Sequence, residues 1–179
     1  MAKDQDLIHI YGGEEDTLSL APLGTTLPTD LATPLPSAWE DTGYNDEAGF
    51  DLNREDDVES FRVHQGGKIV RKKVTSSSTS LVFRTVEDNA LAIRLADNVK
   101  STTAGTGIVT RVNSSAREVQ AFAFCLDLYD GEYHKRITGT RMEVAGGGTE
   151  TFSNSAMTVR EFTGEIIGEY ITIETAPED

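Results

Sequence analysis

The sequence predicts a mainly β protein of the α+β type, in which a β-sandwich or curled sheet carries one flanking helix. Most of the chain after residue 60 consists of short stretches with strand-like patterning, separated by turn signals at Gln65-Gly66-Gly67 and Asp130-Gly131. Residues 87–96 are the one stretch with the apolar spacing of a helix. A chain of 179 residues is long enough to bury roughly 70% of its unfolded surface, which allows a proper core.

The N-terminal part of the chain reads differently from the rest. Residues 18–50 are rich in small residues and hold four of the five prolines, which suit neither a helix nor a central strand. Such a segment is loose in an isolated domain, so we expect another copy of the chain to hold it. We therefore predict a division into an N-terminal strand with an extended arm, residues 1–50, and a β-sandwich domain, residues 51–179.

The first strands are expected to form a hairpin. Residues 60–64 and 68–75 flank the turn at Gln65–Gly67, and residues 80–86 form a third strand. Residues 76–80 are interpreted as a polar linker. Residues 51–57 imitate a calcium loop, but Asp56 replaces the required glycine and Arg62 replaces the bidentate acid, which indicates a solvated acidic loop.

The single helix is predicted over residues 87–96. Acidic residues open it, which favours the helix dipole, Leu91 and Leu95 share one face, and Asp97-Asn98 ends it.

The remaining strands are predicted at residues 107–112, 118–129, 133–144, 157–163 and 166–174. Residues 118–129 are apolar on both faces, so we expect both faces to be covered. Cys125 lies in this strand, and we interpret it as a small core residue. Residues 133–144 are polar on both faces, so this strand is expected to border water or a subunit contact.

No catalytic or metal-binding pattern stands out in the sequence. The three histidines have no partner at metal-ligand spacing, and we expect His64 and His134 on the surface or at a subunit contact. The glycine-rich stretches lack the spacing of a phosphate loop, and there is no Gly-x-Ser-x-Gly motif. The sequence therefore predicts a protein that is not an enzyme and uses no cofactor or metal.

Charge is distributed unevenly along the chain. The net charge is −14, yet residues 61–120 carry ten basic and four acidic side chains. An acidic protein is a poor candidate for ordinary nucleic-acid binding. The run Arg71-Lys72-Lys73 lacks interleaved aromatic residues, so we interpret it as a salt-paired subunit contact. Two interpretations of the charged zones stay open: they meet within one monomer, or they pair between neighbours.

The order of short motifs resembles the major tail, or tail tube, proteins of long-flexible-tailed bacteriophages, especially those of actinobacteria. The residues that carry it are Ala21-Pro22-Leu23-Gly24-Thr25, Leu27-Pro28-Thr29-Asp30, Leu35, Ala38, Asp41, Gly43-Tyr44, Asp46-Glu47-Ala48-Gly49, Gly66-Gly67, residues 81–87, Asn89 and Glu161-Phe162-Thr163. The similarity covers most of the chain.

The resemblance implies a structural virion protein with the fold of the type VI secretion tube subunit. Hexameric rings would stack into the hollow tail tube that conveys double-stranded DNA into the host, without binding the DNA specifically. Partners would be further copies, the tape measure protein and the tail terminator, with no membrane involved. The first ten residues lack the apolar stretch of a signal peptide, so we expect synthesis in the host cytoplasm before assembly into the phage tail.

Two sets of residues are candidates for function. Contacts between subunits are predicted at Pro22, Leu23, Gly24, Thr25, Leu27, Pro28, Trp39, Arg71, Lys72 and Lys73. An acidic wall would hold DNA phosphates off and let DNA slide, so we expect a net acidic lumen, with Glu132 and Glu143 as candidates. The alternatives are a β-sandwich module of a phage that binds carbohydrate or a cell surface, and a minor tail or tail-terminator subunit.

Overall fold

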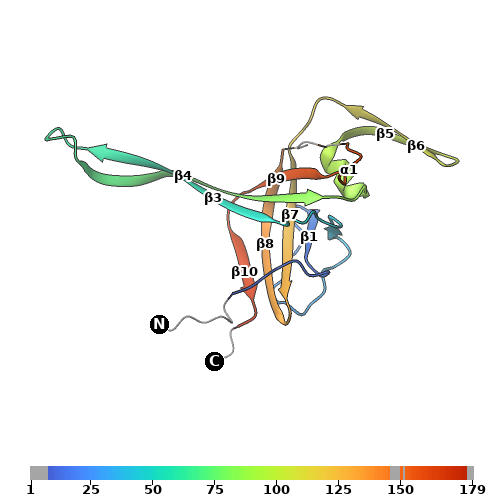
Figure 1. Cartoon of the computed structure of the whole chain (residues 1–179), viewed down its shortest axis with the longest axis horizontal. Coiled ribbons are helices and arrows are strands. Elements are labelled where there is room, and N and C mark those ends of the chain that lie inside the picture. The colour runs from blue at the N-terminus through green and yellow to red at the C-terminus, as the bar shows by residue number, and fades with distance from the viewer. Residues whose placement is uncertain (1–7, 146–149, 151, 177–179) are drawn as a thin grey trace.

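The computed structural model describes residues 8–145, 150 and 152–176. Figure 1 shows a β-rich body from which two hairpins project, with the described ends of the chain close together at one side. In chain order the elements are β1 (Thr17–Pro22), β2 (Glu40–Asp41), β3 (Asp51–Arg62), β4 (Ile69–Thr85), α1 (Ala90–Ala96), β5 (Asn98–Gly105), β6 (Ile108–Ser114), β7 (Gln120–Asp130), β8 (Tyr133–Val144), β9 (Arg160–Ile166) and β10 (Tyr170–Glu174).

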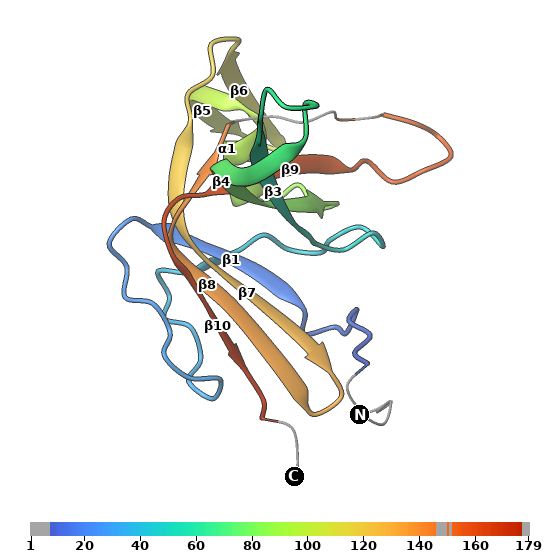
Figure 2. The ribbon, with the colours of Figure 1, turned by 90° about the vertical axis from the view of Figure 1, so that its left-hand side faces the viewer.

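The main sheet of the described residues is antiparallel and sharply bent. Its order is β2-β1-β7-β8-β9-β4-β3, and β10 also pairs with β8. Strand β8 pairs with β10 as far as Gly139 and with β9 from Met142 onward. Figure 2 shows the strands beyond this point running at a clear angle to β1 and β10. The body is therefore one sheet folded over, as the mainly β prediction with a curled sheet and one helix requires.

A bulge and a glycine accompany the bend. The pairing of β7 with β8 shifts between Phe122 and Phe124, so β8 carries one extra residue there. A side chain at Gly139 would place its Cβ 2.6 Å from Cε1 of Phe124. Only glycine therefore lets that phenyl ring approach β8 so closely.

One hydrophobic cluster joins both halves of the sheet and the helix. Strand β9 alternates strictly, with Phe162 and Ile166 buried and Glu161 and Glu165 exposed. The buried members of the cluster are Leu18, Leu20, Leu81, Phe83, Leu91, Leu95, Phe124, Leu126, Ile137, Met142, Val144, Phe162 and Ile166. Burial of Leu91 and Leu95 fixes α1 against this core.

The opposite face of β1 and β7 holds a second, smaller cluster. Ala21, Ala123 and Cys125 pack there with Trp39, and Leu27 and Leu35 of the arm lie against them. The central residues of β7 are thus buried on both faces, which confirms the sequence-based prediction. Cys125 is a free, buried thiol, also as predicted.

The helix is shorter than predicted. It begins after Asn89, whose side chain accepts a hydrogen bond of 2.7 Å from the backbone N–H of Ala92. Glu87 and Asp88 therefore precede the helix, and no acidic residue lies in its first turn. The helix ends at Ala96 and leads directly into β5, a strand that the sequence did not indicate.

Two segments predicted as loops are strands. Residues 51–57 belong to β3, and residues 76–80 belong to β4, paired with each other along the ladder. Polar side chains support this pairing: Ser76 donates to Asp57 Oδ2 at 2.6 Å, and Thr75 Oγ1 donates to the carbonyl of Asp57 at 3.1 Å. The two interpretations were wrong because serine and aspartate find their partners on the opposite strand.

Strand β8 also differs from its prediction. Polar side chains dominate its sequence, yet His134, Arg136, Ile137 and Thr138 are buried. The strand lies between β7 on one side and β10 and β9 on the other. The expectation that it borders water was wrong, because its polar groups bond inside the sheet.

None of the helices in the described residues is long and apolar enough to cross a membrane.

Candidate functional site

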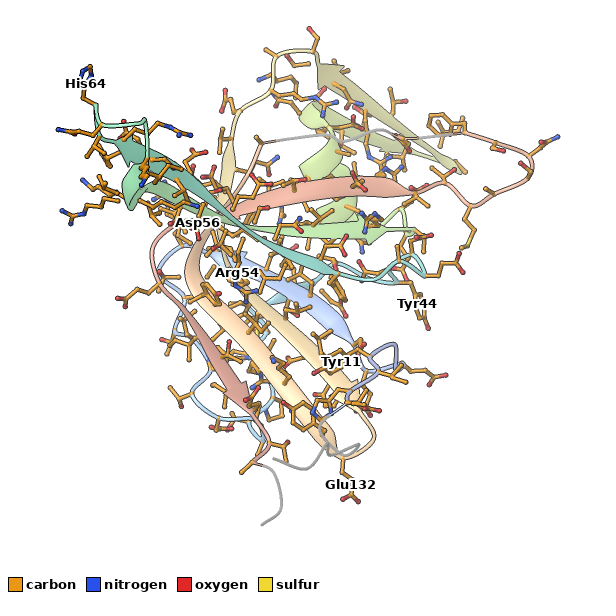
Figure 3. All side chains as sticks on the ribbon, turned by 60° about the vertical axis from the view of Figure 1, so that its left-hand side comes forward. Tyr11, Tyr44, Arg54, Asp56, His64 and Glu132 are labelled. Atoms are coloured by element: carbon orange, nitrogen blue, oxygen red, sulfur yellow. The ribbon has the colours of Figure 1, made fainter. Side chains whose placement is uncertain are left out.

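The most prominent surface feature is the projecting β3–β4 hairpin. The last residue pair between β4 and β9 is Thr79 with Ile166. From Glu55 and Ser78 to the tip, β3 and β4 therefore pair only with each other. The eight residues from 55 to 62 extend the hairpin by about 26 Å at the usual rise per residue of a strand. Figure 3 shows His64 at its far end, away from the body.

One face of this hairpin carries exposed apolar side chains. Val58 lies directly opposite Val74, so their side chains share a face. Both are 50% exposed, and Val70, on the same face by strand alternation, is also exposed; Lys72 lies between the two β4 valines, and the exposed Ile69 lies on the opposite face. An exposed apolar strip on a projecting element is typical of an interaction surface.

The outer part of the hairpin is strongly basic. Residues 60–75 contain five lysines and arginines and no acidic residue. Arg71, Lys72 and Lys73 are exposed, and none of them forms an ion pair with a described residue. Glu59 lies opposite Lys73 in the ladder, without an ion pair. The predicted contact between subunits at these three residues stays a prediction.

A second surface is the outer face of β8, β9, β4 and the inner part of β3. This face lies opposite the core, because each strand turns its apolar residues inward. Glu143 pairs in register with Glu165 across β8 and β9. Side chains alternate between the two faces along each strand, and this alternation places five acidic residues on the outer face: Asp51, Glu55, Glu143, Glu161 and Glu165.

Two arginines neutralise part of this face. Arg84 binds Glu161 through Nε at 2.7 Å and Asp51 through Nη1 at 3.0 Å. The hydrogen bond to Asp51 raises the pKa of the Arg84 guanidinium above its ordinary value. Arg141 pairs with Glu143. Five carboxylates against two guanidinium groups leave the face acidic.

The two acidic candidates from the sequence lie far apart on β8 and its turn. Glu143 is half-buried on the acidic face, near the end of β8. Glu132 lies in the turn before β8, at the other end of the strand (Figure 3). The structure therefore does not bring them together on one surface. Glu161 and Glu165 were missed, although the alternation of β9 could have shown them.

The arm contacts its own subunit at a few points, and most of residues 22–38 are exposed. Pro22 ends β1, and Thr25 donates to the carbonyl of Pro22 through both its N–H and its Oγ1. Leu27 and Pro28 are half-buried, and Leu23 and Gly24 are exposed. Contact between copies through this segment stays a prediction.

Trp39 differs from the rest of the arm candidates. It is 8% exposed and packs on Ala21, Ala123 and Cys125 of its own chain. Contacts within its own subunit therefore hold Trp39 in place, and little of the indole surface remains exposed for contact with a neighbouring subunit. For the rest of residues 18–50, contact with another copy stays a prediction.

A buried ionic cluster fastens the arm to the sheet. Arg136 binds Asp127 with Nε to Oδ1 at 2.6 Å and Nη2 to Oδ2 at 3.1 Å, and Nη1 donates to the carbonyl of Asp30 in the arm at 2.6 Å. His134 Nε2 lies 2.7 Å from Asp127 Oδ1. Burial by itself would lower the pKa of Arg136, but the Asp127 carboxylate outweighs it and raises that pKa.

This cluster corrects the prediction for His134, which is buried and not at the surface. Its ring stacks on Tyr129 at a centroid distance of 4.1 Å. The signal in the sequence was Asp127 itself, because a carboxylate in an otherwise apolar buried strand requires a charged partner. His64, in contrast, lies at the exposed hairpin turn as expected.

No group of three or more histidine, cysteine, aspartate or glutamate residues among those described is placed to hold a metal ion. The chemistry that the described surfaces offer is ionic and apolar contact with other molecules.

Comparison with known proteins adds a family to this geometry. A sequence-family profile described as phage tail tube protein matches residues 14–158. The match covers β1, both projecting hairpins, the helix and the long strands β7 and β8. None of the curated proteins compared with the chain matches it.

Proposed function

This chain belongs to the phage tail tube protein family, and from that premise we propose that its copies form hexameric rings which stack into a hollow tube. The family membership establishes a structural role in the phage tail and assembly as an oligomer with other tail proteins. The number of subunits in a ring, the stacking, and the tape measure and tail terminator proteins as partners are part of the proposal.

The observation that carries this proposal is the unpartnered β3–β4 hairpin. A two-stranded ribbon with an exposed apolar strip at Val58, Val70 and Val74 is only marginally stable in water. Contact with a neighbouring subunit would cover the strip and the basic residues beside it. An isolated globular domain has no need of such a projection.

The acidic outer face of β8, β9, β4 and β3 is proposed to line the lumen. Glu143, Glu161 and Glu165 supply negative charge there, partly balanced by Arg84 and Arg141. A cationic wall would release counterions from DNA, bind it tightly and stall it, whereas an acidic wall leaves it free to slide. Glu132, in the turn at the far end of β8, is retained as a lower-ranked candidate.

The proposal also covers the division of the chain and the absence of catalysis. Residues 1–50 would supply the arm and residues 51–179 the tube domain, with Pro22, Leu23, Gly24, Thr25, Leu27 and Pro28 contacting a neighbour. We propose that the protein is not an enzyme and acts only as a building block. The alternative carbohydrate-binding module is less well supported, because the single tryptophan, Trp39, is buried and cannot serve as a sugar platform.

Negative-stain electron microscopy of the purified protein over a range of concentrations tests this function. We expect rings or hollow tubes of uniform diameter. Particles of monomer size at every concentration, even after addition of the other tail proteins, would contradict it.

A further inference from the structure

The two ends of the β3–β4 ribbon carry opposite charge. The tip holds the five cations of residues 60–75. At the other end β3 begins at Asp51 and β4 ends at Thr85, and the neighbouring segments are acidic. Residues 40–49 hold four acidic residues and no cation, and Glu87 and Asp88 follow β4.

Backbone hydrogen bonds hold these acidic segments together. The N–H of Asp46 donates to the carbonyl of Arg84 at 2.8 Å, and that of Val86 donates to the carbonyl of Tyr44 at 3.0 Å. Gly43 has a φ of +81°, and a side chain there would collide with the carboxylate of Glu87. Residues 43–47 and 84–88 therefore form one surface, which we call the acidic end.

Some charges at both ends have no partner among the described residues, although Glu40 pairs with Arg94 and Asp88 with Arg160. Glu47 and Glu87 make no ion pair and no side-chain hydrogen bond with any residue that the structure describes. The same holds for Lys72 and Lys73 at the tip. Two sets of charge of opposite sign, without partners among the described residues, thus lie at opposite ends of one ribbon.

Apolar surface accompanies the charge at each end. Tyr44 is 72% exposed and lies at the acidic end, remote from His64 at the tip (Figure 3). At the tip, Ile69, Val70 and Val74 are exposed beside the lysines. The tip is therefore positively charged and the acidic end negatively charged, and each has an exposed apolar side chain that a contact between them would bury.

We infer that the hairpin tip of one copy docks on the acidic end of the next copy, so that Lys72, on the face of Val70 and Val74, and Lys73, on the opposite face of the ribbon, flank the contact and meet Glu47 and Glu87, while the valines cover Tyr44. This inference rests on the proposed tube function and names its contact. Because tip and acidic end are different surfaces, the contact is heterologous and leaves a free tip and a free acidic end for further copies. It would therefore propagate an assembly instead of closing a dimer.

A second copy is a better occupant than DNA for the basic tip. A site for DNA needs its cations directed at phosphates, with aromatic groups if single strands are bound, and the tip instead presents an apolar strip between its cations. The acidic end supplies both the opposite charge and an exposed ring on the same chain. Binding of duplex DNA is therefore an outcome that the test must distinguish.

Charge-swap variants test the contact. The tip variant carries Lys72→Glu with Lys73→Glu, and the acidic-end variant carries Glu47→Lys with Glu87→Lys. The matched control, Lys100→Glu with Arg111→Glu, removes two exposed cations from the other projecting hairpin, β5–β6. Circular dichroism and the thermal midpoint establish that each variant is folded, and sedimentation gives the concentration at which half of the protein assembles.

We expect the tip and acidic-end variants each to require about tenfold or more higher concentration to assemble, since two attractive pairs become repulsive. An equimolar mixture of the two should regain assembly, because each reversed surface then meets an oppositely charged partner. One chain with all four substitutions should regain it alone. The control should assemble like the unmodified protein.

Three results would overturn the inference while leaving the tube function in place. Unmodified assembly of the tip variant, no recovery in the mixture or in the fourfold variant, or an equal loss in the control would each do so. Tight binding of duplex DNA by the unmodified tip, lost in the tip variant while assembly is retained, would assign the tip to DNA. Failure of the unmodified protein to assemble at all would instead overturn the proposed function.

Discussion

Arg136 and Asp127 lie directly opposite each other on β8 and β7 and form a two-point ion pair with N···O distances of 2.6 and 3.1 Å. Both side chains are almost completely buried. The third nitrogen of the guanidinium reaches the carbonyl of Asp30, so one arginine connects the core of the sheet with the arm. This pair therefore couples the stability of the subunit to the position of a proposed assembly element.

Replacing Arg136 should destabilise the protein strongly. Arg136→Met leaves the Asp127 carboxylate buried with only His134 and the Cys125 thiol as polar partners, and loss of one partner of a buried pair costs about 3–5 kcal/mol. Urea unfolding measures the change in the free energy of unfolding. Arg141→Met is the control, because its pair with Glu143 is partly exposed and should contribute less than about 1 kcal/mol. Equal effects of the two substitutions would contradict this account.

Trp39→Ala should release the arm while leaving the main core intact. The indole is the largest group in the smaller cluster, and its removal should cost about 3–5 kcal/mol. Limited proteolysis followed by mass spectrometry should then show cleavage within residues 23–38 long before the sheet is cut. Leu23→Ala, at an exposed position of the same segment, is the matched control. Unchanged resistance of the arm in Trp39→Ala would show that other contacts hold it.

Cys125 should be unreactive in the folded protein at pH 8. Burial, followed by the nearby Asp127 carboxylate, raises the pKa of its thiol to about 12. A thiol reagent should label the native protein only as fast as it unfolds, and the Trp39→Ala variant should react faster. Rapid labelling of the unmodified native protein would contradict the packing of the arm over this face.

The same thiol predicts a loss of stability in alkali. Its pKa rises from 9.0 to about 12 on folding, so the unfolded state loses the proton first. The stabilising contribution is complete below pH 9 and falls as the pH rises toward 12. Cys125→Ala should flatten the dependence of the unfolding free energy on pH over this window. An unchanged slope would show that the thiol contributes nothing to it.

Reversing charge on the acidic face should affect DNA passage more than tube formation. Glu161→Lys with Glu165→Lys places cations on the proposed lumen wall, where they would bind phosphates. We expect tubes of normal appearance, retention of duplex DNA at low salt that weakens as salt rises, and slower genome release from phage that carry the variant. Glu132→Lys, in the turn outside this face, is the comparison. Loss of tubes without any gain in DNA retention would place these residues in a subunit contact.

Several elements followed from local pattern alone. Glycines indicated the hairpin turn at residues 65–67, and apolar spacing indicated the helix. Strand β7 was indicated by apolar residues on both of its faces, with Phe124 on one face and Cys125 on the other. The family resemblance carried by short motifs is confirmed for tail tube proteins. Its narrower link to phages of actinobacteria stays a prediction.

Other elements depend on partners that no single segment reveals. Residues 76–80 form a strand because β3 lies opposite, and β8 is buried because Asp127 on β7 receives its arginine and histidine. The acidic face likewise exists only once the register brings Glu143 beside Glu165. The position of Trp39 was missed because burial of the arm depends on a face of β1 and β7 that is far away in the sequence.

An electron cryo-microscopy reconstruction of the assembled protein tests the central claim most directly. The account predicts a hollow tube in which the outer face of β8, β9, β4 and β3 lines the channel and the β3–β4 hairpin contacts a neighbouring copy. A solid or closed assembly, or a tube whose channel is lined by the β5–β6 hairpin or by lysines and arginines, would contradict it.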